Sequence, residues 1–438
     1  MKQTVNINVN HLTRVEGHGN IVVNVNSGKL EKCEWQVPET PRFFEAMVRG
    51  RHYTEIQRIT SRICGICSVG HTLAAVKATE NALAIDITPQ TYKLRSILKH
   101  AENFDSHILH IYFLAAPDLL GVKSVFPLVS THDEVVKCAL RLKRLGHEWG
   151  ALLAGRTTHP TKVLPGGFSK VPDEAALTQL QSKLLAAVPD LQATLETILS
   201  VADKIPDFHR PTEYISLSND NDYAVYDGVI QSVLAYGEKQ RYPLSQYRNV
   251  ANEYVSPLST AKYARNKLDS YAVGAMARFN NNYEQLHVKA QAAAKRLGIE
   301  PICDNPYMNT IAQLVEVFHS VYSTLDIIDE LLSSGIKPEP LVLPARYASG
   351  VGAVEVPRGI LFHEFEFDEK GICTAGNCVI PTNQNHANIQ KDFDALVPEL
   401  LAQDKDEKQM ELALEMLVRS YDPCISCSTH FLDVKFVK

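Results

Sequence analysis

The sequence predicts a mainly α protein with small β elements (an α+β class), in which long helices form a bundle core and an N-terminal β-hairpin is attached to it. Three observations support this prediction. Long segments repeat apolar residues at helical spacing with few breakers. Residues 3–9 and 20–25 alternate apolar and polar side chains, as strands do. Residues 206–258 are richer in Tyr, Asn and Pro, which favours short strands and loops.

The expected elements follow from the same patterns. A strand is expected around Trp35, another around Phe362, Phe365 and Phe367, and Pro381 is expected to end a further strand. The Gly/Pro density at 155–168 indicates a loop. Helices are expected at 41–51, 72–83, 92–114, 132–153, 173–203, 261–297, 309–332 and 406–420.

Composition limits the classes of function. The 438 residues are 45% hydrophobic and 21% charged, with a net charge of -6, which is typical of a globular protein and gives no sign of a nucleic-acid surface. No apolar run reaches the ~18 residues of a membrane span, and the start lacks signal-peptide features. The nine cysteines are an odd number, which argues against a disulfide framework. We therefore expect a cytoplasmic protein, and buried or partly buried thiols at Cys33, Cys138, Cys303 and Cys373.

Two Cys-x-x-Cys pairs stand at opposite ends of the chain. Cys64 and Cys67 are followed by His71, and Cys424 and Cys427 are followed by His430. Four soft sulfur ligands with imidazoles close behind are the donor set of a metal site. We expect one interlocked unit over 1–438, whose metal site is closed by residues 62–71 and 422–430.

Two common explanations of such pairs fit poorly. A structural zinc site usually takes its pairs from segments roughly 15 to 20 residues apart, whereas these pairs are almost a whole chain apart. A thioredoxin-type redox site needs a single pair at a helix start. What remains is a site in which the cysteines hold something chemically active.

Three motifs then identify a family. Residues 14–19, residues 62–67 with His71, and residues 422–427 with His430 together resemble the large subunit of nickel-iron hydrogenases. The resemblance runs from residue 11 to residue 430, and it implies the large-subunit fold that the quinone-site subunit of complex I shares. The implied activity is reversible heterolytic cleavage of H2 to protons and electrons at a Ni-Fe centre.

The resemblance assigns roles at that centre. It implies that Cys64 and Cys424 are terminal ligands of nickel and that Cys67 and Cys427 bridge nickel and iron. A terminal thiolate such as that of Cys424 is a plausible first base. The equivalent of Glu16 relays protons to and from a nickel-bound cysteine, a role that suits a carboxylate with a raised pKa.

Further residues are expected around the iron, which carries cyanide and carbon monoxide in this family. Cyanide accepts hydrogen bonds, which Arg358 and Thr382 can donate, whereas carbon monoxide prefers apolar neighbours such as Ile380. Arg358 could also position or polarise H2. In this family an aspartate often stands where this chain has Ser106. The expected cofactor-binding residues are Pro357, Arg358, Ile380, Pro381, Thr382 and His71.

The resemblance also implies a magnesium ion beneath the active site. Its expected ligands are Glu45, the backbone carbonyl of Cys378 and His430, in line with the preference of Mg²⁺ for few carboxylates and several waters.

Partners are implied as well. Once the four cysteines are used, no cysteine cluster is left for an iron-sulfur centre, so an iron-sulfur small subunit is expected, with His159 near the boundary between the subunits. Cytoplasmic members often add flavin or NAD(P)-linked subunits, and this chain has no Gly-x-Gly-x-x-Gly nucleotide motif of its own. Two alternatives stay open: a zinc-stabilised scaffold and a complex I-like quinone-site subunit.

Overall fold

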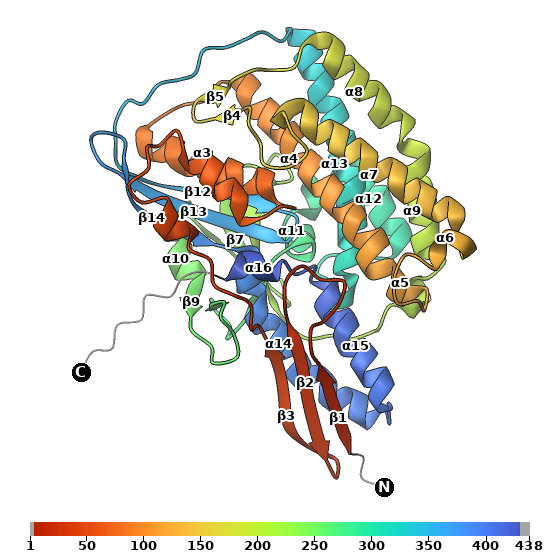
Figure 1. The fold of residues 1–438 in the computed structure, drawn as a ribbon. Coiled ribbons are helices and arrows are strands. Elements are labelled where there is room, and N and C mark those ends of the chain that lie inside the picture. The colour runs from red at the N-terminus through yellow and green to blue at the C-terminus, as the bar shows by residue number, and fades with distance from the viewer. Residues whose placement is uncertain (1–3, 430–438) are drawn as a thin grey trace, which may run out of the picture.

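The computed structural model describes residues 4–429. An antiparallel sheet projects at the N-terminal end, formed by β1 (Val5–Val9), β2 (Asn20–Asn26) and β3 (Lys29–Gln36) in that order (Figure 1). Alternate side chains of β2 are buried, and the others are partly exposed. The predicted hairpin and the strand around Trp35 are therefore confirmed, and they form one sheet. The loop between β1 and β2 carries Glu16.

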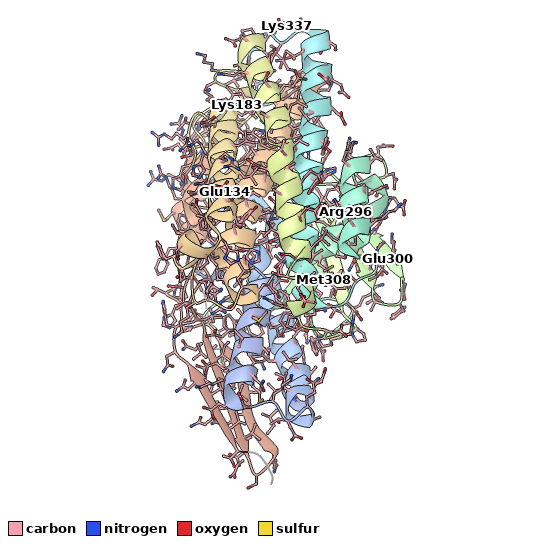
Figure 2. The ribbon with its side chains drawn as sticks, turned by 90° about the vertical axis from the view of Figure 1, so that its right-hand side faces the viewer. Glu134, Lys183, Arg296, Glu300, Met308 and Lys337 are labelled. Atoms are coloured by element: carbon pink, nitrogen blue, oxygen red, sulfur yellow. A yellow bond between two sulfur atoms is a disulfide. The ribbon has the colours of Figure 1, made fainter. Side chains whose placement is uncertain are left out.

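A bundle of long helices forms one side of the molecule. Helix α13 packs against α4, α8 and α12, and α4 also packs against α7. Figure 2 views this side, with Met308 just before the start of α13 and Lys337 just beyond its end. The bundle helices are α4 (Pro89–Leu109), α7 (Asp133–Ala154), α8 (Glu174–Ala186), α9 (Val188–Leu199), α12 (Val288–Leu297) and α13 (Asn309–Ser334).

Most of the predicted bundle helices are confirmed, with local differences. Helix α4 begins at Pro89, after the N-cap Thr88, whose side chain accepts from the Thr91 N–H. Its last predicted turns, residues 110–115, are π-helical, and α5 (Ala116–Leu119) and the short α6 (Leu128–Thr131) follow. The predicted helix at 173–203 is two helices, because α9 starts anew with Pro189 in its first turn.

The predicted helix at 261–297 is wrong in its first half. This part forms β10 (Tyr263–Arg265) and β11 (Tyr271–Ala272), and only then come α11 (Ala275–Asn282) and α12. The two strands pair with strands that lie earlier in the chain. The second strand pairs with the distant residues 213–214, and the first pairs with the nearer residues 252–254. Tyr263 and Tyr271 are buried, and tertiary context of this kind overrides local helical spacing.

Residues 206–258 form short strands and loops, as predicted. Strand β11 pairs with β6 (Glu213–Ser218), which continues through β7 (Val229–Leu234) to β8 (Lys239–Tyr242). The remaining short elements are α10 (Tyr247–Val250), β9 (Asn252–Tyr254), which pairs with β10, and the hairpin of β4 (Val163–Leu164) and β5 (Gly167–Phe168).

A third sheet carries α3 (Ser68–Leu83) across it. Its strands are β12 (Ser349–Val356), β13 (Gly359–Phe367) and β14 (Cys373–Val379). At Gly352 in β12, a side chain would overlap the backbone of Ala74 and Ala78 in α3. At the end of β12, Val356 lies against Gly70 in the first turn of α3, so the end of the strand lies beside the helix start that follows Cys67.

The C-terminal helices complete the fold. They are α14 (Pro381–Ala402), α15 (Glu407–Ser420) and the short α16 (Ile425–Ser428), which lies centrally in Figure 1. Helix α15 confirms the prediction for 406–420. Helix α14 was not predicted, because Pro381, expected to end a strand, lies in its first turn.

Two short helices precede α3. The helix predicted at 41–51 is only the single turn α1 (Phe44–Met47), and α2 (Ile56–Thr60) follows it. Among residues 4–429, no helix combines the length and the apolar character needed to cross a membrane.

Candidate metal centre

The first cysteine pair lies where a 3-10 turn (Ser61–Ile63) meets α3. Cys64 follows the turn, and Cys67 is the N-cap residue of α3. The Cys67 N–H donates to the Cys64 sulfur at 3.1 Å. Both side chains are buried. The local backbone therefore presents both sulfurs to the same point inside the protein.

The second pair lies at the end of α15. Asp422 has a positive φ of 49°, and the chain turns there before Cys424, the N-cap residue of α16. The Cys424 N–H donates to the Thr382 hydroxyl at 3.0 Å. Thr382 lies in the first turn of α14, so this helix holds the second pair in place.

The fold brings the two pairs together. Ligand atoms of Cys64, Cys67, Cys424 and Cys427 all lie within 4.8 Å of one another. The Cys64 and Cys424 sulfurs are 3.5 Å apart, and those of Cys424 and Cys427 are in contact. Within residues 4–429 this is the one group of His, Cys, Asp or Glu found with metal-site spacing. Four buried sulfurs around one point fit a soft metal such as nickel.

The charge of Arg358 acts on the thiols. Burial raises the pKa of Cys64, but its hydrogen bond with Cys67 and the Arg358 guanidinium lower it, and the lowering prevails. The pKa of Cys67 is raised, because it shares a proton with Cys64 and is buried. The cluster therefore favours at least one thiolate, the form that binds metals.

Arg42 links the two cysteine segments, a role that sequence reasoning missed. Its guanidinium donates to the Ile63 carbonyl, just before Cys64, at 2.6 Å, and to the Ser426 carbonyl. Its backbone N–H donates to the Thr429 carbonyl at 3.2 Å. The sequence showed only a basic residue after a proline, so no local signal predicted this contact.

Glu16 lies against the second pair. Its Oε2 accepts from the Cys424 thiol at 3.2 Å and from the Ser426 N–H at 3.1 Å, while its Oε1 accepts from the Ser426 hydroxyl. Its backbone pairs with the same segment, since the Ile425 N–H donates to the Glu16 carbonyl at 2.8 Å. Gly17, with φ of 86°, has no room for a side chain against Ile425 and Ser426.

Arg358 lies at the β12–β13 turn, beside the cysteines, and is buried. Its guanidinium donates to the Asp422 carbonyl at 2.6 Å, to Asp422 Oδ1 at 2.8 Å and to the Ser106 hydroxyl at 3.3 Å. Burial opposes the charge of Arg358, but Asp422 and the nearby thiols keep its pKa above the ordinary value. Asp422 is thus the bound counterion, and Ser106 offers only a neutral acceptor.

The other predicted cofactor-binding residues are also buried nearby. Thr382 is joined to the Cys424 backbone, as described above, and Ile380 and Pro381 directly precede it at the start of α14. Pro357 directly precedes Arg358. His71 lies in α3, one turn after Cys67, with Nδ1 3.1 Å from Nε2 of His363.

Two of the three predicted magnesium ligands are adjacent. A Glu45 carboxylate oxygen accepts from the Cys378 N–H at 2.8 Å. Burial raises the pKa of Glu45, and this hydrogen bond opposes the rise. A second carboxylate, that of Glu253, forms an ion pair with Lys262, and its negative charge also raises the pKa of Glu45. The sequence analysis did not predict a role for Glu253 at this site. His430 lies outside the described residues.

His159 lies beside the first cysteine pair. Its N–H donates to the Ser68 hydroxyl at 2.9 Å, and its Nδ1 is 2.9 Å from the Ser61 carbonyl. Arg62 and Gly65, in the same loop region, are exposed. This edge of the site is therefore accessible to a partner.

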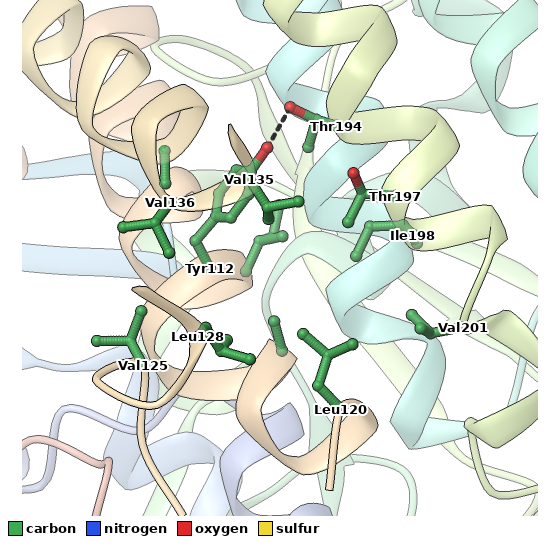
Figure 3. Close-up of a pocket in the computed structure, with 13 residues that line it drawn as sticks. Tyr112, Leu120, Val125, Leu128, Val135, Val136, Thr194, Thr197, Ile198 and Val201 are labelled. Atoms are coloured by element: carbon green, nitrogen blue, oxygen red, sulfur yellow. Dashed lines mark hydrogen bonds between the residues drawn. The ribbon is translucent and has the colours of Figure 1, made fainter. Parts of the chain in front are cut away.

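A separate cavity lies in the helical part and differs in chemistry from the cysteine cluster. It adjoins the π-helical turn and is lined almost entirely by apolar side chains such as Leu120, Val135 and Ile198 (Figure 3). The Tyr112 hydroxyl and Thr194 Oγ1 are 2.7 Å apart at its edge. Its lining offers no group of metal ligands.

Comparison with known proteins bears on the identity of this site. The sequence matches the family described as nickel-dependent hydrogenase over residues 42–135 and 275–430, and a HoxL-like family over residues 6–40. The chain belongs to the nickel-dependent hydrogenase family. Both cysteine pairs lie inside the matched ranges.

Individual relatives extend the match along the chain. The chain is 30% identical over 426 residues to the alpha subunit of sulfhydrogenase 1 of Pyrococcus furiosus, covering 97% of each chain. It is 31% identical to a subunit of the F420-non-reducing hydrogenase of Methanothermobacter thermautotrophicus, covering 98% of this chain and 95% of the relative. A crystal structure of an NAD+-reducing [NiFe]-hydrogenase in the H2-reduced state superposes with a TM-score of 0.88 at 27% identity, covering 97% of this chain and 99% of the other.

These findings confirm the prediction of a hydrogenase large subunit with its mainly helical fold. The chain is an oxidoreductase that acts on hydrogen. The relatives are hydrogenase subunits, so the comparisons favour this family over a quinone-site subunit or a zinc scaffold.

Proposed function

We propose that this hydrogenase subunit holds a Ni-Fe centre between Cys64, Cys67, Cys424 and Cys427 and cleaves H2 reversibly into protons and electrons. The observation that carries the proposal is the meeting of four buried sulfurs within 4.8 Å of one another. When bound, nickel and iron would supply the Lewis-acidic position at which H2 is polarised. The residues around the four cysteines would transfer protons and contact the ligands of iron.

Proton transfer is assigned to Cys424 and Glu16. A proton held at the Cys424 sulfur lies 3.2 Å from Glu16 Oε2, which is within reach for direct transfer. The Ser426 N–H and hydroxyl fix the carboxylate in this orientation. Glu16 is only partly buried, so it can pass the proton outward. We therefore assign Glu16 as the first carrier after the thiol.

The other side of the cluster is assigned to the diatomic ligands of iron, cyanide and carbon monoxide. Thr382 accepts from Cys424 through its oxygen, which leaves its own hydroxyl proton available to donate to cyanide. Arg358 is held by Asp422 with its charge beside the thiols, so it can donate as well and orient H2. Ile380, Pro357 and Pro381 provide apolar surface for carbon monoxide. His71 supports this pocket from α3.

A magnesium ion is proposed at Glu45, with the Cys378 carbonyl and His430 as further ligands. The adjacent positions of Glu45 and Cys378 support this assignment. Mg²⁺ would keep the buried Glu45 ionised by compensating the raised pKa.

Electrons leave through partners in this proposal. The exposed loop at Arg62 and Gly65, with His159 behind it, is the surface where we place an iron-sulfur small subunit. The similarity to an NAD+-reducing enzyme favours additional flavin or NAD(P)-linked subunits. We also propose a cytoplasmic location, in line with the odd number of cysteines.

Metal analysis and infrared spectroscopy of the purified complex test the proposal. We expect nickel in an amount equal to this chain, more iron than nickel because the small subunit carries iron-sulfur clusters, and cyanide and carbon monoxide stretching bands. Cys64→Ser should lose nickel, whereas Cys373→Ser, a buried thiol outside the cluster, should keep it. Zinc alone would support a scaffold, and a protein without metal would support a quinone-site subunit.

A further inference from the structure

Arg278 in α11 is a completely buried arginine whose hydrogen bonds are all satisfied. Its side chain has 0% exposure. It donates two bonds to Glu316, at 2.6 and 2.7 Å, and one to Glu355 at 2.9 Å. The other two go to the carbonyls of Val356 and Pro357, each at 2.9 Å. A guanidinium has five N–H donors, so every donor is used.

The two carbonyls belong to the turn that carries Arg358. Val356 pairs with Gly359 in the β12–β13 ladder, so Pro357 and Arg358 form a two-residue turn between the strands. Arg278 therefore binds the last strand residue and the first turn residue. Arg358 extends from the same turn toward Asp422 and the cysteines. A shift of this turn would therefore move the guanidinium of Arg358.

Other elements fix Arg278 itself. Glu316, from α13, also accepts from the Tyr223 hydroxyl at 2.6 Å and lies 2.7 Å from His107 Nε2. Glu355 accepts from the Leu217 N–H at 2.7 Å. The carboxylates of Glu316 and Glu355 fix the plane of the Arg278 guanidinium. Its two remaining N–H groups therefore point at the turn.

We propose that Arg278 is a positioning residue for Arg358, which acts by binding the carbonyls of Val356 and Pro357 and so fixing the turn beside the cysteine cluster. This inference rests on the role proposed for Arg358 above. Arg278 touches neither the cysteines nor the site of H2 by any hydrogen bond in the described residues. Its effect is transmitted through the backbone of the turn.

Replacement by lysine provides a direct test. Lysine keeps the charge but has three donors at one nitrogen, so Arg278→Lys cannot hold both carboxylates and both carbonyls. A displacement of the turn by about 1 Å lowers the rate by roughly 100-fold. We expect such a fall in kcat with the KM for H2 little changed. We also expect the cyanide bands to move, because the donor from Arg358 moves.

Arg95 offers a matched control. It is equally buried, makes two bonds to Glu80 at 2.7 and 2.8 Å, and donates to the Leu164 carbonyl at 3.0 Å. None of its partners belongs to the cysteine site. Arg95→Lys should lower thermal stability as Arg278→Lys does, but leave the cyanide bands and kcat at the wild-type values.

A double-mutant cycle separates positioning from a general structural role. If Arg278 acts through Arg358, then Arg278→Lys should have little further effect on kcat in an Arg358→Lys background. If Arg278→Lys does not accumulate with nickel, Glu355→Gln takes its place in the same measurements. That variant weakens one bond to Arg278 and should move the bands less.

The outcomes are distinct. Cyanide bands that stay in place in Arg278→Lys, or that move equally in Arg95→Lys, would overturn the positioning role. Additive effects in the double mutant would overturn it too. Wild-type protein without cyanide bands would instead refute the proposed Ni-Fe site, whereas wild-type bands that Arg278→Lys leaves unchanged refute only the inference about Arg278.

Discussion

The Cys424 thiol donates a hydrogen bond to the Glu16 carboxylate across 3.2 Å, although the two residues are 408 positions apart in the chain. The contact joins the loop of the N-terminal sheet to the last cysteine pair. A sulfur that is both a metal ligand and a proton donor to a carboxylate can couple the two functions.

Glu16→Gln should lower H2 turnover by roughly 10² to 10⁴-fold, the contribution typical of a positioned proton carrier. Glutamine keeps the size and can accept from Ser426, so nickel and iron contents should stay at the wild-type level. H2 oxidation and H/D exchange measure the loss. Glu39→Gln, which changes a carboxylate bonded to the His18 N–H in the same region, is the control. Wild-type activity in Glu16→Gln would assign Glu16 a structural role.

Thr382→Val should disturb both the backbone of Cys424 and the cyanide pocket. The change removes the acceptor of the Cys424 N–H, and an unsatisfied buried N–H costs about 1 to 3 kcal/mol. We expect a lower unfolding temperature and a shift of one cyanide band. Thr324→Val is a matched control, because Thr324 is buried in α13 and its hydroxyl has no hydrogen-bond partner among the described residues. Equal band positions in both variants would contradict the assignment of Thr382.

Glu45→Gln should reduce the magnesium content and activity while the nickel and iron remain bound. Burial raises the pKa of Glu45, so protons compete with magnesium at a higher pH than for an exposed glutamate. Magnesium should therefore leave the wild-type protein as the pH falls and protons displace the ion from Glu45. Elemental analysis after dialysis at several pH values measures the loss. Retention of magnesium by Glu45→Gln at every pH would place the ion elsewhere.

Glu355→Gln should change how stability depends on pH. Burial raises the pKa of Glu355 from 4.5 to about 7, although the facing Arg278 lowers it and Glu316 adds to the rise. Because folding raises the pKa of Glu355, the folded protein binds a proton at this carboxyl more tightly than the unfolded chain does. The stabilisation that this proton gives to the folded state is complete below pH 4.5 and is lost as the pH rises toward 7. The loss in wild type is on the order of 3 kcal/mol.

Denaturant unfolding of both proteins at about pH 4.5, 6 and 8 spans this interval and measures the effect. The stability of Glu355→Gln relative to wild type should rise across the interval, since glutamine does not titrate. Glu366→Gln, at an exposed position of the adjacent strand β13, should follow the wild-type curve. A constant difference between Glu355→Gln and wild type would contradict the raised pKa.

Local patterns in the sequence predicted much of this molecule. Helical spacing over 309–332 predicted α13, and alternation at 20–25 predicted β2, because both depend on which face of one element is buried. The four cysteines were found from their own Cys-x-x-Cys spacing, whereas Glu16 and Arg358 were found because the short motifs that carry them resemble those of a known family. The helix, the strand and the short motifs each depend on residues that are close together in the chain, so they can be predicted from the sequence alone.

Tertiary structure decided the rest. The strand at 271–272 forms because the distant strand β6 pairs with it, and the strand at 263–265 pairs with β9 across a loop. Helical spacing of apolar residues does not show either partner. Arg42 binds a carbonyl 384 positions away, and Arg278 serves a turn that is 79 positions away at Pro357. Every residue has a backbone carbonyl, so the sequence cannot show which carbonyl accepts a hydrogen bond from a given arginine. Only the folded chain determines which carbonyl a buried guanidinium meets, and thereby where Arg358 is held beside the four sulfurs.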